Sequence, residues 1–516
     1  MVIRLLFLAF LLLAGCVSQP YEATPSHSLP AGHSTLGQHI ARLAESHPQD
    51  HSGFRLLASS TDAFNARGEM IRAAEVSLDI QYYIVDDGLT TRGLVADLLD
   101  AADRGVRVRI LLDDTASDGV DRALATLAAH PNIEIRVFNP IYRGRGTLVT
   151  RLFGRAANFS RQHRRMHNKL MLADSNLAIV GGRNLGDVYF DADQVWNFMD
   201  MDLLGAGPIA ARLGGSFDEY WNHRLSVPIQ RFLRHPPLGE DLREARDGIV
   251  RYFARARVSD RDHYERLMAY RYEDGFLEWL EEMTWAPGEA YWDSPDKILA
   301  QGLPPPELLL VTELLPVLEQ TRDELVLISG YFVPTADGVQ LIRTQVERGI
   351  QVAIMTNALE ATDVPLVHGG YAPYRHELLE MGVRLFELRR QPGQEPSFSY
   401  SGDSESSLHS KAAIIDGERV FIGSLNFDPR SVWWNTEVGI LVDSPELARE
   451  VHRLSLEGMA PAVSYEVRLR EQDGAQRLVW VAEDDGEVVL LEREPGGLWR
   501  HVNAWMARIL GLENLL

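Results

Sequence analysis

The segment from Arg164 to Asn184 reads RRMHNKLMLADSNLAIVGGRN, and the segment from Leu408 to Asn426 reads LHSKAAIIDGERVFIGSLN. Both fit the pattern His-x-Lys-x4-Asp-x6-Gly-x-x-Asn. The first copy contains His167, Lys169, Asp174, Gly181 and Asn184, and the second contains His409, Lys411, Asp416, Gly423 and Asn426. On composition alone, five fixed positions match at roughly one start in tens of millions. The pattern therefore indicates a duplicated site rather than two unrelated surface histidines.

Other stretches echo each other at similar spacing. ADRGVRVRILLDD, ending at Asp114, corresponds to VERGIQVAIMTN, ending at Asn357, and each follows a stretch of helical character. VSLDIQYYIV corresponds to LVLISGYFVP, and IEIRVF corresponds to VRLFEL. A glycine at the end of each helix, Gly105 and Gly349, suits a helix C-cap. The order strand, helix, strand, strand before each motif predicts an α/β half that is used twice.

Each motif also predicts a β-hairpin. KLMLAD and LAIVGG are short apolar strands on either side of Ser175 and Asn176, and KAAIID and RVFIGS lie on either side of Gly417 and Glu418. Alternation along a strand puts the His and the Lys of each motif on the same face. Neither half has a complete set of reactive groups, so we expect the two copies to face each other across one cleft.

Lysine is rare in this chain, which has 51 basic residues but only three lysines, at 169, 297 and 411. An ammonium group is a compact charge with three rotatable donors, whereas the arginine fork is planar and rigid. Lysine beside histidine therefore suits a phosphoryl group whose geometry changes during a reaction. Lys297 lies in WDSPDK, which predicts either a head-group contact or a buried turn.

The paired motif favours phosphoryl transfer over metal binding. A lysine next to each histidine would repel a divalent cation, and the body of the chain lacks the Cys/His pairs of zinc sites. We expect no metal and no cofactor. Two lysines and two asparagines could hold the phosphoryl oxygens, one imidazole could attack phosphorus, and the other could protonate the leaving group. An orienting carboxylate is expected for each imidazole. The candidates on downstream strands are Asp200, Asp202 and Glu437.

The segments RMHNKLMLAD, GGRNLGDVYF and LHSKAAIIDGERVFIGSLNFDPRS resemble the phospholipase D superfamily, and specifically bacterial cardiolipin synthases of the C type. The resemblance extends from about Phe54 to the C-terminus. It implies an α/β fold of two pseudo-repeated αβα sandwich halves that share one active-site cleft, and metal-independent phosphodiester chemistry.

For single residues, the resemblance implies that His167 is the nucleophile and His409 the acid and base. The other residues of the predicted site are Lys169, Lys411, Asp174 and Asp416 of the motifs, Asn184, Ser424 and Asn426 for phosphate, and Asp200 and Glu437 to orient the histidines. The two motif aspartates are expected to be more structural than chemical. One departure is Gly182, where many members have Ser, as at Ser424. A pair of carboxylates at a strand end, Asp113 and Asp114, predicts a solvated turn.

The N-terminus reads MVIRLLFLAFLLLAGC and resembles a bacterial lipoprotein signal that ends at Cys16, the only cysteine. We expect lipidation at Cys16 and a membrane-anchored protein facing the periplasm, with the outer membrane favoured because Val17, rather than Asp, follows the cysteine. Residues 19–34, rich in Pro, Ser and His, predict a tether. The formal charge of -22 argues against a general nucleic-acid partner. The resemblance to cardiolipin synthases implies phospholipid substrates.

The length of 516 residues predicts two or three cores. The predicted parts are a signal peptide (1–16), a tether and N-terminal segment (17–50), a first half (51–235), a helical connection (236–306), a second half (307–465) and C-terminal strands with a helix (466–516). Residues 142–167 carry seven arginines and no acid, and predict a segment that docks on an anionic bilayer.

The predicted function is a cardiolipin synthase-like phosphatidyltransferase that works through a phosphohistidine. Two alternatives stay open. A phospholipase D-type hydrolase or nuclease could use the same site with another acceptor, and a non-catalytic lipoprotein could bind anionic lipid in the cleft. Completeness of both motifs argues against simple binding, since binding would not require two histidines.

Overall fold

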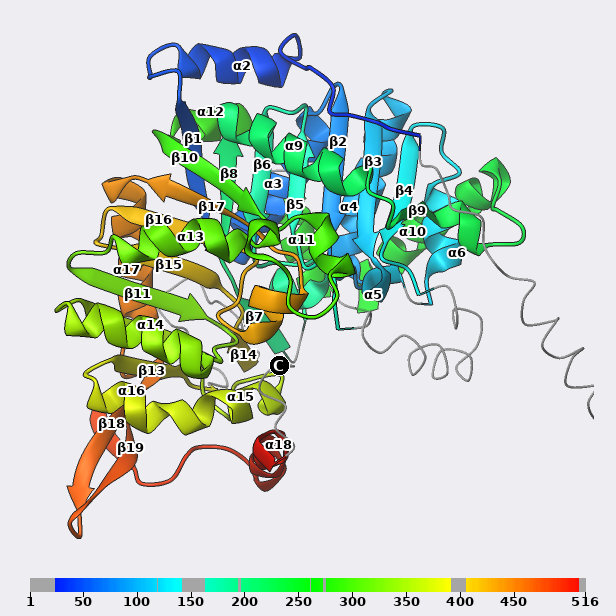
Figure 1. Cartoon of the computed structure of the whole chain (residues 1–516). Coiled ribbons are helices and arrows are strands. Elements are labelled where there is room, and N and C mark those ends of the chain that lie inside the picture. Colours follow the sequence, from blue (N-terminus) through cyan, green and yellow to red (C-terminus); the bar gives the residue numbers. More distant parts are fainter. Residues whose placement is uncertain are drawn as a thin grey trace, which may run out of the picture.

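The structure is a computed structural model that describes residues 24–117, 119–141, 163–193, 196–259, 261–271, 275–390 and 405–509. Its centre is one continuous sheet shared by two similar halves (Figure 1). The strands pair in the order β9-β4-β3-β2-β5-β6-β8-β1 in the first half, and continue as β10-β17-β16-β15-β11-β12-β13-β18-β19-β20 in the second half.

The strands of the first half are β1 (His51–Leu57), β2 (Ser77–Tyr82), β3 (Arg107–Asp113), β4 (Ile133–Phe138), β5 (Leu170–Ala173), β6 (Leu177–Gly181), β8 (Asp202–Ala206) and β9 (Ser226–Pro228). Those of the second are β10 (Thr284–Trp292), β11 (Glu324–Ser329), β12 (Gln351–Asn357), β13 (Arg384–Leu388), β15 (Lys411–Ile415), β16 (Arg419–Gly423), β17 (Val438–Asp443), β18 (Ser464–Gln472), β19 (Ala475–Asp484) and β20 (Glu487–Leu491). The order β4-β3-β2-β5-β6-β8 therefore repeats as β13-β12-β11-β15-β16-β17, which confirms the predicted duplication.

Both predicted hairpins form, as β5–β6 and β15–β16. Apart from Lys411 and the half-buried Arg419, which begin β15 and β16, their residues are apolar or glycine and buried, because helices cover both faces of the sheet. The predicted helices are α4 (Leu89–Asp103) and α14 (Thr335–Glu347). Gly105 and Gly349 follow these helices with φ of 99° and 87°, a left-handed conformation that favours glycine at a helix end.

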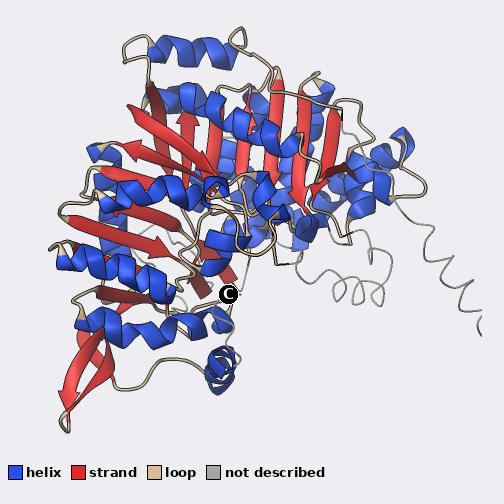
Figure 2. Cartoon of the chain, in the orientation of Figure 1, coloured by secondary structure: helices blue, strands red, loops and turns tan. Residues whose placement is uncertain are grey.

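Helices and sheet alternate in layers (Figure 2). One core lies between the first-half sheet and α3 (Ser60–Ala73) and α4. A second core lies between the second-half sheet and the helices α13 (Leu310–Glu319), α14 and α16 (Arg375–Glu380). A third core lies between these two and is shared by both halves. In it α9 (Pro208–Trp221) and α17 (Pro445–Gly458) pack with strands of both halves. The halves are therefore joined by common apolar packing as well as by strand pairing.

The connection between the halves is only partly helical. α10 (Gly239–Ser259), α11 (Arg261–Arg271) and α12 (Phe276–Glu281) are helices as expected. The aromatic-rich stretch that follows is the strand β10, which pairs with β1 of the first half and β17 of the second. The prediction of a helical connection is wrong for these residues, because strand pairing across the two halves decides their conformation.

The predicted tether is also partly wrong. Residues 24–34 lie on the first half, where Ser26 and Ser28 donate backbone hydrogen bonds to Asn222 and Asp218 of 2.9 and 2.7 Å. They lead into α2 (Thr35–Ala44). Cys16 and the rest of the predicted tether lie outside the described residues. Within the described residues, no helix combines the length and the apolar character needed to cross a membrane.

Candidate active site

The two motif histidines lie where the halves meet. Backbone pairing brings each histidine to a segment of the other half: His167 N donates to Thr436 O at 2.9 Å, and His409 N donates to Met199 O at 2.8 Å. Met199 ends β7 (Trp196–Met199), which pairs with β14 (Glu405–Leu408) just before His409. Thr436 and Met199 directly precede Glu437 and Asp200. Each histidine is therefore held beside a carboxylate of the opposite half.

The side chains complete this crossed arrangement. His167 Nδ1 lies 2.9 and 3.0 Å from the two carboxylate oxygens of Glu437, and His409 Nδ1 lies 2.6 Å from Asp200 Oδ2. Both carboxylates predicted as histidine partners are in contact with an imidazole, and all four groups are buried. With Nδ1 engaged, Nε2 is the ring nitrogen that each histidine keeps for chemistry.

Asp202, the alternative orienting carboxylate, has a different role. Its carboxylate binds Arg67 Nη2 at 2.9 Å and Arg183 Nη1 at 3.3 Å. All three side chains are buried, so the acid is neutralised inside the first half. The expectation that Asp202 could replace Asp200 is wrong, because β8 directs it to arginines and not to a histidine.

Gly182 explains how the short Asp200 side chain fits. A Cβ atom at this position would lie 2.2 and 2.4 Å from the carboxylate oxygens of Asp200. The equivalent residue in the second half is Ser424, whose hydroxyl donates to Glu437 Oε2 at 2.5 Å. The residue at this position therefore varies with the carboxylate that it contacts. Glycine leaves room for Asp200 in the first half, and serine donates a hydrogen bond to the longer Glu437 in the second half.

The two motif lysines are buried beside their histidines. Lys169 Nζ donates to His167 O at 2.7 Å, and Lys411 Nζ donates to His409 O. Burial lowers the pKa of Lys169 to about 7 and lowers that of Lys411, although Glu437 and Asp200 oppose the shift. Each ammonium has further donors, so both can bind the oxygens of an anion between them.

The electrostatic field keeps the imidazoles neutral. Burial, Lys169 and Lys411 hold the pKa of His167 well below its usual range, and burial with Lys411 lowers the pKa of His409 to about 4. Burial opposes ionisation of Asp200, but His409 and Lys411 lower its pKa to about 2. Burial raises the pKa of Glu437 to about 7, against the influence of Lys169. A neutral imidazole has the free lone pair that a nucleophile or base requires.

The motif aspartates serve the backbone. Asp174 accepts from the backbone amides of Glu75, Val76 and Ser77 at 2.8–3.1 Å, where β2 begins. Asp416 accepts from the amides of residues 322–324 in the same way. Both aspartates have positive φ, which aspartate tolerates better than most residues. These contacts favour the structural role that the resemblance implies.

The three residues predicted for phosphate differ in their contacts. Asn184 binds Ile84 N at 3.2 Å and the Tyr189 hydroxyl at 2.9 Å. Ser424 Oγ donates to the carboxylate of Glu437 and accepts from Val438 N. These contacts favour a supporting role for both. The buried Oδ1 of Asn426 has no hydrogen-bond partner among the described residues, so Asn426 keeps an unused polar group at the site.

Aromatic side chains form walls around the histidines. Tyr83 packs edge-on against His167 with ring centroids 4.9 Å apart, and Tyr331 packs in the same manner against His409 at 6.4 Å. Phe198 lies 5.0 Å from His409. Sequence reasoning missed these residues. Both corresponding stretches, QYY and SGYF, carry a tyrosine where the strand ends, which is the signal that could have found Tyr83 and Tyr331.

Two buried acids behind the site were also missed or misread. Asp113 is fully buried and accepts from Met166 N at 3.0 Å, so the predicted solvated turn is wrong. Asp293 accepts from Glu437 N at 2.8 Å and pairs with Lys297 Nζ at 2.9 Å. Lys297, the third lysine, thus lies in a buried turn, and its ion-pair partner Asp293 holds the backbone of Glu437. Among the described residues, no group of three or more His, Cys, Asp or Glu could hold a metal ion.

Comparisons with known proteins agree with this geometry. The family described as "Cardiolipin synthase, PLD-like domain" matches residues 68–221 and 314–455, one match in each half and more than half of the chain together. The chain is 36% identical over 501 residues to "Cardiolipin synthase C" of Escherichia coli (strain K12), covering 93% of this chain and 99% of that protein. It is 32% identical over 503 residues to an uncharacterized protein of Helicobacter pylori (strain ATCC 700392 / 26695), covering 96% of each.

The fold has a solved counterpart. The crystal structure of phosphatidylserine synthase from Haemophilus influenzae Rd KW20 superposes with a TM-score of 0.56 at 14% identity, covering 93% of this chain and 100% of that one. This likeness supports the two-half fold alone. With the family match in both halves and the near full-length identity to the E. coli protein, the chain belongs to the cardiolipin synthase family of phospholipase D-like proteins.

Proposed function

We propose that this protein is a phosphatidyltransferase that makes cardiolipin from two phospholipids through a phosphohistidine. The observation that carries the proposal is the crossed pairing of His167 with Glu437 and of His409 with Asp200, which makes one site from two halves. A relative of nearly equal length is named cardiolipin synthase C, which supports this choice of reaction.

The first step forms the covalent intermediate. Nε2 of His167 attacks the phosphorus of a donor phospholipid, the P–N bond forms, and the bond from phosphorus to the head-group oxygen breaks. His409 Nε2 gives a proton to that oxygen, so the head group leaves as an alcohol. Glu437 stabilises the positive charge on His167 through Nδ1–H, as the aspartate does in a serine protease triad.

The second step reverses these roles. The hydroxyl of the acceptor phospholipid gives its proton to His409, its oxygen attacks phosphorus, and the P–N bond breaks to return His167. Before the first step His409 must carry a proton, although burial and Lys411 lower its pKa to about 4. The anionic phosphate between the lysines supplies the opposing charge that favours the protonated imidazole.

Three groups would hold the phosphate. Lys169 and Lys411 provide compact charges with rotatable donors, which suits oxygens that move as phosphorus is inverted. Asn426 can donate from its side-chain NH2 group to a phosphate oxygen, since an amide nitrogen is a donor whereas the unpaired Oδ1 is an acceptor. Asn184 and Ser424 support this set from behind through Tyr189 and Glu437.

Hydrolysis by the same site is the competing function. Both histidines are largely shielded, with 7% of His167 and 6% of His409 exposed, and aromatic rings border each of them. Limited access for water favours a lipid hydroxyl as the acceptor. The same chemistry with water would give a phospholipase D-type hydrolase, so the acceptor has to be determined by experiment.

The test is the product formed from one lipid. Purified protein is incubated with labelled phosphatidylglycerol, and the products are identified by mass spectrometry. Cardiolipin and free glycerol in equal amounts are expected. Phosphatidic acid as the main product would identify a hydrolase, and lipid binding without any product would identify a binding protein. His167→Ala and His409→Ala serve as inactive controls.

We also propose that the protein is a lipoprotein anchored at Cys16 that faces the periplasm, with the outer membrane favoured. The support is the sequence MVIRLLFLAFLLLAGC and the Val that follows it. Cys16 and residues 142–162 of the arginine-rich segment lie outside the described residues. Fractionation of cells that express wild type or Cys16→Ser tests the anchor; wild type free in solution would contradict it.

A further inference from the structure

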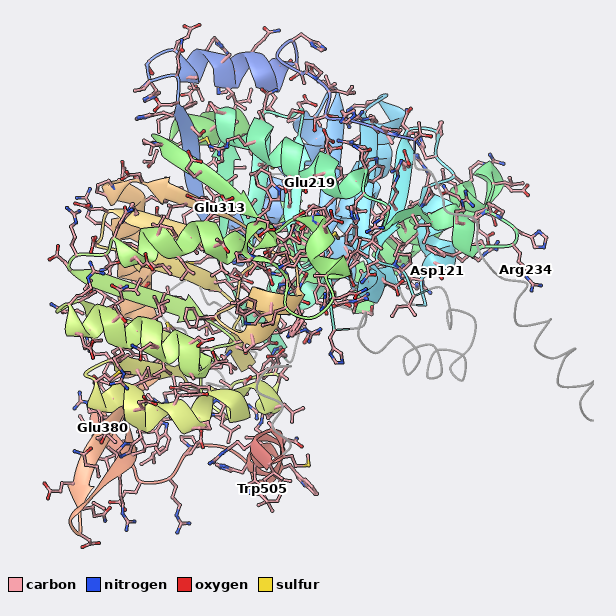
Figure 3. The ribbon with its side chains drawn as sticks, in the orientation of Figure 1. Asp121, Glu219, Arg234, Glu313, Glu380 and Trp505 are labelled. Carbon is pink, nitrogen blue, oxygen red and sulfur yellow. The ribbon has the colours of Figure 1, made fainter. Side chains whose placement is uncertain are left out.

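The C-terminal helix α18 (Leu498–Ile509) presents an apolar face to solvent. Trp499 is 78% exposed and Trp505 57% exposed. Figure 3 shows Trp505 on the outer side of α18, at the end of the molecule. The other exposed apolar side chains of this helix are Leu498, Met506 and Ile509. Positions 498 and 505, and 499 and 506, are two helical turns apart, and 509 lies one turn beyond, so these five side chains form one continuous stripe.

The opposite side of α18 is firmly attached to the second half. Ala504 and Ala507 are buried, and Gly369 of α15 (Pro365–Tyr371) comes so close that a Cβ there would lie 2.2 Å from Ala504 O. Arg500 donates to the carbonyls of Leu359 and Thr362 at 3.2 and 2.5 Å. The helix is therefore fixed with its apolar stripe outward, where it serves no core of the described chain.

Charge beside the stripe is positive on balance. Residues 498–509 contain Arg500, His501 and Arg508 and no acid. A hollow of about 370 Å³ at the start of α18 is lined by Arg390 and Arg500 together with one acid, Glu360. Tryptophan with neighbouring arginine is typical of segments that lie at the surface of an anionic bilayer.

The size of the stripe favours a bilayer over a second copy of the chain. A helix of this length is about 18 Å long and roughly 10 Å wide, which gives about 200 Å². A stable protein interface needs about 800 Å² on each partner. A bilayer takes up single inserted side chains without that requirement, since each buried apolar group contributes on its own.

The stripe is connected to the catalytic part of the second half. α15 lies under α18, and its His368 binds Asn357 O through Nδ1 and Glu494 through Nε2. Asn357 Nδ2 donates to Leu408 O at 2.8 Å, directly before His409. A surface fixed by α18 therefore has a defined position relative to the second histidine.

We propose that the outer face of α18 docks on an anionic phospholipid bilayer and holds the second half at the lipid surface. This inference rests on the proposed function, because a phospholipid substrate gives the enzyme a reason to bind the bilayer at that end. Trp499 and Trp505 enter the interface, while the exposed Arg508 beside them binds lipid phosphates.

The first experiment reports where α18 lies. Because Cys16 is the only cysteine, Cys16→Ser permits one labelled cysteine elsewhere in the full chain. A polarity-sensitive fluorophore is attached in Met506→Cys, which keeps both tryptophans, or in Glu313→Cys, which lies on an exposed part of α13 as control. Vesicles containing phosphatidylglycerol should shift the emission at 506 to shorter wavelength and leave that at 313 unchanged. Vesicles of phosphatidylcholine alone should have a smaller effect. No shift at 506, or a shift that depends on protein concentration without vesicles, would overturn the proposal.

The second experiment measures turnover. Trp499→Ser/Trp505→Ser is compared with Leu238→Ser/Leu456→Ser, which changes two exposed apolar residues elsewhere. The tryptophan pair should lower the rate on phosphatidylglycerol vesicles about tenfold, leave hydrolysis of a short soluble phosphodiester unchanged, and keep the thermal midpoint. Equal vesicle rates in both double variants would overturn the proposal. If the wild type turns over neither substrate, the proposed function fails, and the fluorophore still decides where α18 lies.

Discussion

Replacing Gly182 with serine or alanine tests how closely Asp200 must approach His409. A Cβ at this position would lie 2.2 and 2.4 Å from the carboxylate oxygens and 2.6 Å from Cγ of Asp200. Ordinary contacts between such atoms are about 3.5 Å, so the carboxylate has to move by about 1 Å. This movement breaks the contact of 2.6 Å with His409 Nδ1.

The expected effect is a large loss of activity. A displacement of about 1 Å in the groups that position a reacting residue costs on the order of 100-fold in rate. Because the Cβ atom causes the conflict, Gly182→Ala and Gly182→Ser should lose activity equally. The assay is kcat/KM on labelled phosphatidylglycerol and on a short soluble phosphodiester, with thermal unfolding to show that the variants fold.

Ser424→Gly is the matched control in the other half. It leaves Glu437 in place but removes one hydrogen bond to its carboxylate. A hydrogen bond to a charged group contributes about 1.5–3 kcal/mol, so this variant should lose activity roughly 10- to 100-fold. Activity of Gly182→Ala within threefold of wild type would refute the argument. A fully active Gly182→Ser beside an inactive Gly182→Ala would show that a hydroxyl can replace the lost contact.

Three further predictions concern the surroundings of the site. Lys297→Met should destabilise the protein by about 3–5 kcal/mol, because Asp293 is then buried without its ion-pair partner. Asp293→Asn/Lys297→Met should regain stability in urea unfolding. Its turnover should stay slow, because the Lys297 charge that lowers the pKa of Glu437 is gone. Burial raises the pKa of Asp428 to about 7, so between about pH 4 and pH 7 the folded state keeps a proton that the unfolded state releases, and stability falls as the pH rises. Asp428→Asn should therefore gain stability relative to wild type across this range, and a constant difference between the two proteins from pH 4 to pH 8 would contradict the assignment. Turnover of the soluble phosphodiester should be unchanged after treatment with a chelator; loss of activity that a divalent ion restores would show that a metal takes part.

The sequence predicted the parts of the fold that depend on local pattern. The hairpins around Ser175 and Gly417 follow from short apolar strands on either side of turn residues, and both form as expected. The repeat itself predicted two equivalent halves. Asp200 and Glu437 were identified as orienting carboxylates because each follows its motif near an expected strand; in the structure they lie just before β8 and β17.

Long-range pairing could not be predicted in this way. The carboxylates cross between the halves because Thr436 and Met199 bind the backbone of the opposite histidine, and nothing local to either motif indicates that contact. β10 was missed because its aromatic residues and Pro287 do not alternate like a strand, and its pairing with β1 and β17 decides its structure. Asp113 was misread because a carboxylate at a strand end looks solvated until Met166 and Arg165 are packed over it.

The most direct test of the unequal roles of the histidines is the mass of the intact protein after a single turnover. His409→Ala lacks the base that activates the acceptor but keeps His167 with its partner Glu437. After incubation with a phospholipid whose leaving group needs no protonation, His409→Ala should gain the mass of one phosphatidyl group, which peptide mapping places on His167. His167→Ala should gain none under the same conditions. A phosphatidyl group on His409 in His167→Ala, with none on His167 in His409→Ala, would contradict the account.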